Sequence, residues 1–136
     1  MQQHPYEATR TRQHVRRAHV HHGALIATTV RDYLEEEHTR AISLAELATL
    51  TGVSSFHLSR VFRRTMGVPP HAYLSQVRVR RACALLERGV TVSIVTHATG
   101  FFDQSHFTRT FKRIVGVPPG EYARSISPHI ADRQSA

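Results

Sequence analysis

Two arginines, Arg60 and Arg109, stand at the same point of two similar stretches of this sequence. RVFRRTMGVPP at 60–70 and RTFKRIVGVPP at 109–119 agree at seven of eleven positions. A guanidinium group can fork onto a phosphate or onto the O6 and N7 atoms of guanine, because its donors lie fixed in one plane. The repeated arginine therefore suggests one kind of polar recognition that the chain performs twice.

The charge of the chain favours a polyanionic partner. Of its 136 residues, 18 are Lys or Arg and 10 are Asp or Glu, which gives a formal net charge of +8. Lys112 is the only lysine. Arginine suits nucleic acid, but a GC-rich genome produces the same bias, and both explanations stay open. The stretch between Glu46 and Glu87 has no acid yet contains six arginines, which predicts one basic face.

The first copy has the signals of a short helix, a turn and a second helix. Ser43 and Glu46 have the spacing of a capping box, which begins a helix. Gly52 fits a turn that needs positive φ. An amphipathic helix over 55–66 follows, and Pro69 and Pro70 prevent its continuation. This order predicts a helix-turn-helix unit at 43–66.

The second copy predicts a further helix-turn-helix unit at 91–114. Its turn glycine is Gly100, and Thr91 stands in place of the serine cap. Ile94 occupies the position of Glu46, so the capping box is lost. One residue has been inserted between Gly100 and Gln104 relative to the first copy.

The rest of the chain also has helical periodicity, so we expect an all-α fold of about seven helices. The ordered domain should cover 24–124. The further helices are expected at 24–37, at 70–88 as a linker helix, and near 119–124. Flexible tails are expected at 1–23 and 125–136.

The residues that carry these units resemble the AraC/XylS family of bacterial transcription regulators. The matching segments are LATLTGVSSFHLSRVFRRTMGVPPHAYL at 47–74 and TGFFDQSHFTRTFKRIVGVPPGEY at 99–122. The resemblance implies a DNA-binding domain with two helix-turn-helix subdomains. It also implies a structural role for Arg78. The departures are small: Thr96 replaces the usual alanine and should crowd the second unit slightly, and Phe56 stands where some relatives have tryptophan.

A helix-turn-helix unit lays its second helix in the major groove, and the outward side chains near the start of that helix reach the bases. Helical geometry and the resemblance agree on the positions. Arg60 and Arg109 suit guanine, Gln104 suits adenine, and Phe56 suits a thymine methyl group. The predicted base-reading residues are Phe56, Ser59, Arg60, Gln104, Ser105, Thr108 and Arg109. The predicted phosphate contacts are Ser55, Arg63, Arg64, Lys112 and Arg113. The alternative for either guanine-reading arginine is a surface ion pair.

The two reading faces differ, so the predicted target is an asymmetric site in double-stranded DNA. The two helices would enter successive major grooves roughly 34 Å apart. We expect a transcription activator in the bacterial cytoplasm, associated with the nucleoid. Exposed acids on the first helix could contact RNA polymerase: Asp32, Glu35, Glu36 and Glu37. An effector-binding or dimerisation domain is the other expected partner, either missing from a standalone member or lost from a longer chain.

Two other classes of function compete with DNA binding. Histidines crowd the N-terminal segment and could hold Zn²⁺ or Ni²⁺ loosely, but ordered ligands at the right spacing are lacking, so no metal and no cofactor is expected. A basic tail that touches DNA is the favoured role of His14, His19, His21 and His22. Cys83 could be a nucleophile, but it lies on an apolar helix face, so no enzyme activity is expected. The N-terminal segment lacks an apolar signal region, and no membrane segment is expected.

Overall fold

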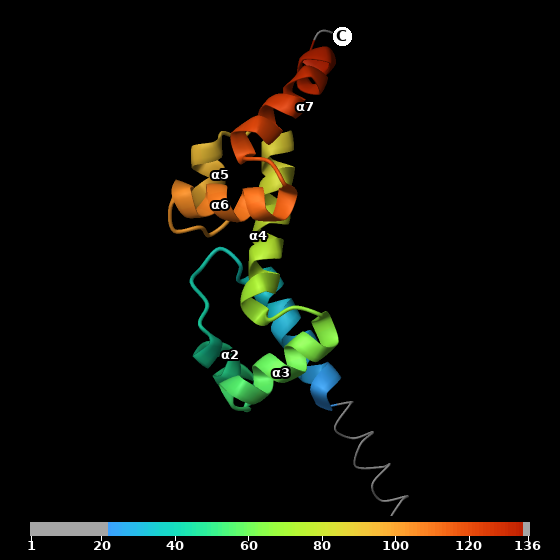
Figure 1. Ribbon diagram of the computed structural model, residues 1–136, viewed down its shortest axis with the longest axis vertical. Coiled ribbons are helices and arrows are strands. Elements are labelled where there is room, and N and C mark those ends of the chain that lie inside the picture. Colours follow the sequence, from blue (N-terminus) through green and yellow to red (C-terminus); the bar gives the residue numbers. More distant parts are fainter. Residues whose placement is uncertain (1–21, 135–136) are drawn as a thin grey trace, which may run out of the picture. The chain divides into compact units, whose positions relative to one another are not determined.

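The computed structural model describes residues 22–134, and within this range it contains helices and no strand (Figure 1). The first helix covers 22–36 of the described chain. The others are α2 (Leu44–Thr51), α3 (Ser55–Met66), α4 (Pro70–Glu87), α5 (Val92–Ala98), α6 (Gln104–Val115) and α7 (Pro119–Gln134). The predicted all-α fold with about seven helices is confirmed. No helix in this range is both long and apolar enough to cross a bilayer.

The chain divides into two compact units, each of which contains one helix-turn-helix pair. The N-terminal unit consists of the first helix as far as Tyr33 and of Ser43–Pro70. The C-terminal unit consists of Leu34–Ile42 and of the chain from His71 onward. The segment 34–42 therefore precedes the first helix-turn-helix pair in sequence but belongs to the unit that holds the second.

The N-terminal unit is built as the sequence predicts. Ser43 caps α2 by accepting a hydrogen bond from the backbone N–H of Glu46, at 3.1 Å. Gly52 ends that helix with a φ of +71°. Six apolar residues of the unit are buried: Ile26, Ala27, Val30, Leu47, Leu58 and Phe62. In α2 the apolar Leu47 is buried, whereas Leu44 is 40% exposed.

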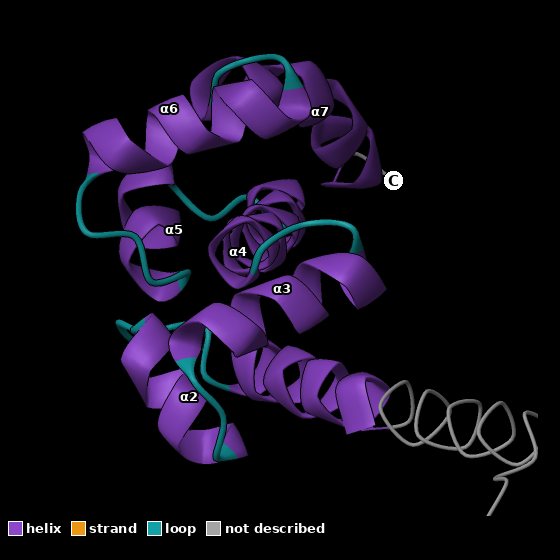
Figure 2. Ribbon diagram, turned by 60° about the horizontal axis from the view of Figure 1, so that its bottom comes forward, coloured by secondary structure: helices purple, strands orange, loops and turns teal. Residues whose placement is uncertain are grey.

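The C-terminal unit packs α4, α5, α6 and α7 around one apolar cluster (Figure 2). Its fully buried members are Val79, Ala82, Leu86, Val95, Phe101, Phe107 and Phe111. Aromatic rings run through this cluster, with centroids 5.0 Å apart for Phe101 and Phe107 and 5.6 Å apart for Phe107 and Phe111. The rings of Phe111 and Tyr122 continue the series at 5.5 Å.

The last helix is longer than the sequence analysis predicted. A short helix near 119–124 and a flexible tail over 125–136 were expected, but α7 continues to Gln134. Tyr122, Ala123 and Ile126 lie on one helical face and pack against the core cluster, which accounts for the helix as far as residue 126. At the other end, residues 22 and 23 belong to the first helix instead of the predicted tail. The rest of that predicted tail, 1–21, lies outside the described residues.

Two buried threonines lie in α5 and at its C-terminal cap. Thr96 matches Ala48 of the first copy, whereas Thr99 matches Thr51. The hydroxyl of Thr96 donates to the carbonyl oxygen of Val92 at 2.8 Å, and that of Thr99 donates to Val95 at 2.7 Å. Within the described residues, every buried side-chain polar atom has a hydrogen-bond partner. Backbone acceptors four residues earlier thus satisfy hydroxyls that would otherwise be costly to bury.

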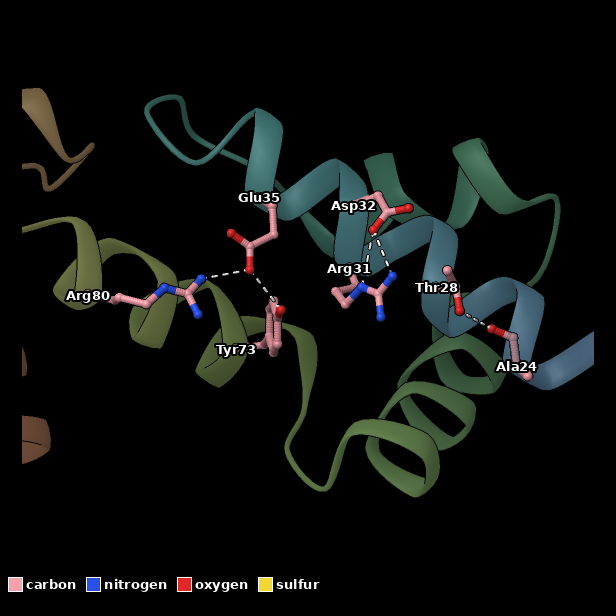
Figure 3. Close-up of polar contacts among 7 residues, drawn as sticks. All are labelled: Ala24, Thr28, Arg31, Asp32, Glu35, Tyr73 and Arg80. Carbon is pink, nitrogen blue, oxygen red and sulfur yellow. Dashed lines mark hydrogen bonds and ion pairs between the residues drawn. The ribbon is translucent and has the colours of Figure 1, made fainter.

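The segment 34–42 is held in the C-terminal unit by four hydrogen bonds with side chains of α4. Glu35 accepts hydrogen bonds from Arg80 at 2.7 Å and from the hydroxyl of Tyr73 at 2.9 Å (Figure 3). Arg78 donates to the carbonyl oxygens of His38 at 2.8 Å and Arg40 at 3.0 Å. Arg78 therefore has a structural role, which is to bind the backbone of segment 34–42 to α4.

The Glu35 contacts should make stability depend on pH. Burial raises the pKa of Glu35, but hydrogen bonds from Arg80 and Tyr73 outweigh burial and leave the pKa below its ordinary value. A carboxyl with a lowered pKa in the folded state stabilises the fold above its unfolded pKa, about 4.3, and the contribution is lost as pH falls through the folded pKa. We expect Glu35→Gln to flatten the acid side of the stability profile, measured as the urea midpoint between about pH 3 and 6.

Glu36→Gln is the matched control for this experiment, because Glu36 is the exposed neighbour of Glu35 on the same helix. It should leave the acid slope of the urea midpoint close to that of the wild type. Equal slopes for wild type and Glu35→Gln would contradict the assignment.

Candidate nucleic-acid interface

Helix α3 has one buried face and one outward face. Ser54 caps it by accepting from the backbone N–H of His57 at 3.1 Å, and Leu58 and Phe62 are buried beneath it. The predicted DNA-contacting residues lie elsewhere on the helix. Phe56, Arg60, Arg63 and Arg64 are exposed, and Ser55 and Ser59 are half-buried.

Phe56 and Arg60 form a pair on this outward face. Phe56 is 72% exposed, which is unusual for a phenyl ring. The Cζ atom of Arg60 lies 5.7 Å from the centroid of the Phe56 ring. This distance is typical of a cation–π contact, which orients the guanidinium group without neutralising it.

Helix α6 repeats the arrangement with different side chains. Its cap is Asp103, which accepts from the backbone N–H of His106 at 2.7 Å. Its buried residues are Phe107, Thr110 and Phe111. The four predicted base-reading residues of this unit line one shallow surface hollow: Gln104, Ser105, Thr108 and Arg109. The predicted phosphate contacts Lys112 and Arg113 are exposed on the same helix.

The arginines of the described residues differ in whether they are paired. Among the side chains described, in residues 22–126, ion pairs join Arg31 to Asp32 at 3.0 Å, Arg40 to Glu37 at 3.2 Å and Arg80 to Glu35 at 2.7 Å. Neither Arg60 nor Arg109 belongs to one. Arg80 is exposed and is paired with Glu35.

The same contacts reduce the acidic surface of the first helix. Glu35 is half-buried and bonded to Arg80 and Tyr73, so it is not a free acid as the sequence suggested. Asp32 and Glu36 remain exposed. Asp32 accepts two hydrogen bonds from Arg31, as Figure 3 shows.

Some features of the interface were not anticipated from sequence. Phe102 follows the second turn glycine by two residues and is 89% exposed. It stands at the position of the extra residue in the second copy, which is the only signal that could have marked it. His106 packs edge-on against Phe101, with ring centroids 5.4 Å apart.

Other kinds of site find less support in the described part of the chain. Within it, no group of three His, Cys, Asp or Glu side chains could hold a metal ion. The histidines His14, His19 and His21 lie outside the described residues. Burial raises the pKa of the half-buried Cys83 thiol, so this group forms the nucleophilic thiolate less readily.

Comparison with known proteins identifies what kind of interface this is. A family model described as a helix-turn-helix domain matches residues 47–125. The chain is 41% identical over 76 residues to an uncharacterized HTH-type transcriptional regulator, YbfI, of Bacillus subtilis. That match covers 56% of this chain but only 28% of the relative, which is a much longer protein.

Two solved structures share the fold. A probable AraC family transcriptional regulator from Rhodopseudomonas palustris is 31% identical with a TM-score of 0.68, over 74% of this chain and 96% of that one. The DNA-binding domain of AdpA, solved in complex with a target DNA, is 25% identical with a TM-score of 0.72, over 76% and 94%. The chain belongs to the AraC/XylS family of helix-turn-helix transcription regulators, and its two units form a DNA-binding domain of that family.

Proposed function

We propose that this domain binds an asymmetric site in double-stranded DNA by placing α3 and α6 in two successive major grooves. One observation carries the proposal. The two helices arise from a duplicated unit, yet they present different side chains on the matched outward face, with Phe56 in one and Ser105 in the other. Two different faces on one chain favour two different half-sites, whereas a palindrome needs two identical ones.

The proposed roles follow from donor geometry. Arg60 and Arg109 each donate to O6 and N7 of a guanine, and Gln104 binds the N6 and N7 atoms of an adenine. Their freedom from ion pairs in the described residues supports these roles, because a paired guanidinium would first have to lose its partner. Ser59, Ser105 and Thr108 are short neighbours that approach the base edges between the longer side chains.

The proposed phosphate contacts flank these residues. They are Ser55, Arg63 and Arg64 on α3 and Lys112 and Arg113 on α6. Such contacts position the protein on the duplex and supply affinity that depends on salt, but they carry no sequence information.

Selection of bound sites from random DNA tests the proposal. We expect the wild type to select one asymmetric site of two half-sites. Arg60→Ala and Arg109→Ala should each relax a different half, at a cost of about 1–3 kcal/mol, because each removes one bidentate contact to guanine.

Arg63→Ala is the matched control in that selection. As a phosphate contact, it should weaken binding to all sequences about equally and reduce the salt dependence, with the preferred site unchanged. If Arg60→Ala and Arg109→Ala behaved as Arg63→Ala does, the base-reading roles would be wrong. A wild-type protein without any sequence preference would refute the proposal itself.

The regulatory role that we propose is activation of transcription by a cytoplasmic, nucleoid-bound protein. The exposed carboxylates of Asp32 and Glu36 on the first helix support a contact with RNA polymerase. An effector-binding or dimerisation domain would supply the signal. The length of YbfI, of which the match covers only 28%, shows that a relative carries further chain beside this part.

A catalytic role has little support beside this one. The candidate nucleophile, Cys83, is half-buried and its pKa is raised, and it lies in the packing of the core cluster beside Tyr122. We therefore propose a binding domain without enzyme activity.

A further inference from the structure

The outward face of α3 carries a feature that α6 lacks, namely an aromatic ring beside the guanine-reading arginine. Phe56 and Arg60 lie four residues apart, so both side chains project from the same side of the helix. The guanidinium carbon is 5.7 Å from the ring centroid, and the ring is 72% exposed. In α6 the matched positions hold Ser105 and Arg109, and Ser105 is too short to reach over its arginine.

The position of the ring defines what it can touch. A guanidinium forked onto guanine lies close to the plane of that base, so its face is turned toward the neighbouring base step. The C5 substituent of a pyrimidine projects into the major groove at that step. A phenyl ring held beside the guanidinium would pack against a methyl group there, whereas a bare C5–H would leave the ring partly in water.

We propose that the Phe56–Arg60 pair selects a methylated pyrimidine followed by guanine, so that the first unit accepts 5-methylcytosine–guanine as well as thymine–guanine. Thymine and 5-methylcytosine carry the same methyl group at C5, and the proposed contact of the ring is with that methyl group. Methylation of a cytosine–guanine step would therefore convert a weak half-site into a strong one. This inference rests on the proposed function, since it assumes that Arg60 binds guanine.

The contrast with the second unit makes the proposal specific. Arg109 has no aromatic neighbour at the matched position, so the pyrimidine before its guanine should be read without regard to its methyl group. The duplication thus provides an internal control within one protein, on one duplex.

The test uses the full 136-residue chain and the duplex obtained by selection. The guanine that depends on Arg60 is located by the relaxed preference of Arg60→Ala. Binding is then measured by fluorescence anisotropy on four duplexes that carry thymine, deoxyuridine, cytosine or 5-methylcytosine before that guanine, with the modification on that strand only. We expect thymine and 5-methylcytosine to bind about three- to fivefold more tightly than deoxyuridine and cytosine, the effect of burying one methyl group.

Phe56→Ser introduces the residue of the second unit at the matched position. It should abolish the methyl preference but keep the preference for guanine, and the same four substitutions before the guanine of Arg109 should change binding little in either protein. Because Phe56 is exposed, the variant should fold normally, which its thermal unfolding would verify. The converse variant, Ser105→Phe, should create a methyl preference in the second half-site.

The outcomes separate this inference from the proposed function. If guanine preference depends on Arg60 but thymine and deoxyuridine bind equally, the inference is wrong and the proposed function stands. If the methyl preference survives in Phe56→Ser, another residue reads the methyl group and the inference is likewise wrong. If no guanine depends on Arg60, the inference fails together with the base-reading role of Arg60, and the asymmetric site is judged by the selection with the wild type.

Discussion

Gly100→Ala is expected to destabilise the domain by about 2–5 kcal/mol. Gly100 has a φ of +86°, which costs a residue with a side chain about 1–2 kcal/mol. A Cβ atom added there would also lie 2.5 Å from the carbonyl oxygen of His38 and 2.9 Å from the Cα of Thr39. Both are backbone atoms, so they cannot rotate away, and overpacking of this kind costs a further 1–3 kcal/mol or so.

The duplication supplies the control for this prediction. Gly52 is the matching turn glycine, with a φ of +71°, but an added Cβ would meet nothing within 4 Å. Gly52→Ala should therefore cost about 1–2 kcal/mol, the conformational part alone. Urea unfolding of both variants measures the difference. If the Gly100→Ala variant were as stable as Gly52→Ala, the backbone of His38 and Thr39 would move away from the added Cβ at little cost in free energy, and the prediction would be wrong.

Arg78→Ala is expected to cost about 2–4 kcal/mol of stability. Its half-buried guanidinium donates to the carbonyl oxygens of His38 and Arg40, and its Cζ lies 5.8 Å from the ring centroid of Phe101. Hydrogen bonds from a charged group contribute about 1.5–3 kcal/mol each, and they are not additive. Loss of the side chain would also leave two carbonyl groups without this donor.

Two further variants distinguish the planar donor geometry of the Arg78 guanidinium from its positive charge. Arg78→Lys should recover only part of the loss, because an ammonium group lacks the planar pair of donors that spans both carbonyls. Arg81→Ala removes an exposed arginine from the same helix and should change stability by less than about 0.5 kcal/mol. Unfolding midpoints of Arg78→Ala and Arg81→Ala that coincide would show that the contacts of Arg78 contribute nothing.

Local signals were sufficient to predict most of the helices from sequence. Caps and turn glycines act over three to five residues, and Ser43, Ser54 and Gly52 play the parts that their positions predict. The part of α7 beyond 124 was missed because Ile126 packs against a core assembled from other helices, which the local sequence does not express. Locally, Ser127 followed by Pro128 favours the end of a helix.

Contacts between distant segments were the part that sequence could not provide. The repeat predicts that Gly100 turns the chain, but nothing in it indicates that His38 and Thr39 lie against that turn. The acids of the first helix look alike in sequence, yet only the fold brings Glu35 to Arg80 and Tyr73. The contact between Arg60 and Phe56 could have been predicted from sequence, because residues four apart on a helix are neighbours on its surface.

The assignment of segment 34–42 to the C-terminal unit has a consequence for synthesis on the ribosome. All of the N-terminal unit has been made once Pro70 is added, so this unit can begin to fold while the chain is growing. His38 and Arg40 must wait for Arg78, and Thr39 must wait for Gly100, about 60 residues later. At roughly 5–20 residues per second this delay lasts about 3–12 s. During that interval segment 34–42 interrupts the N-terminal unit without its partners in the C-terminal unit. The carbonyl groups of His38 and Arg40 remain solvated until Arg78 has been made.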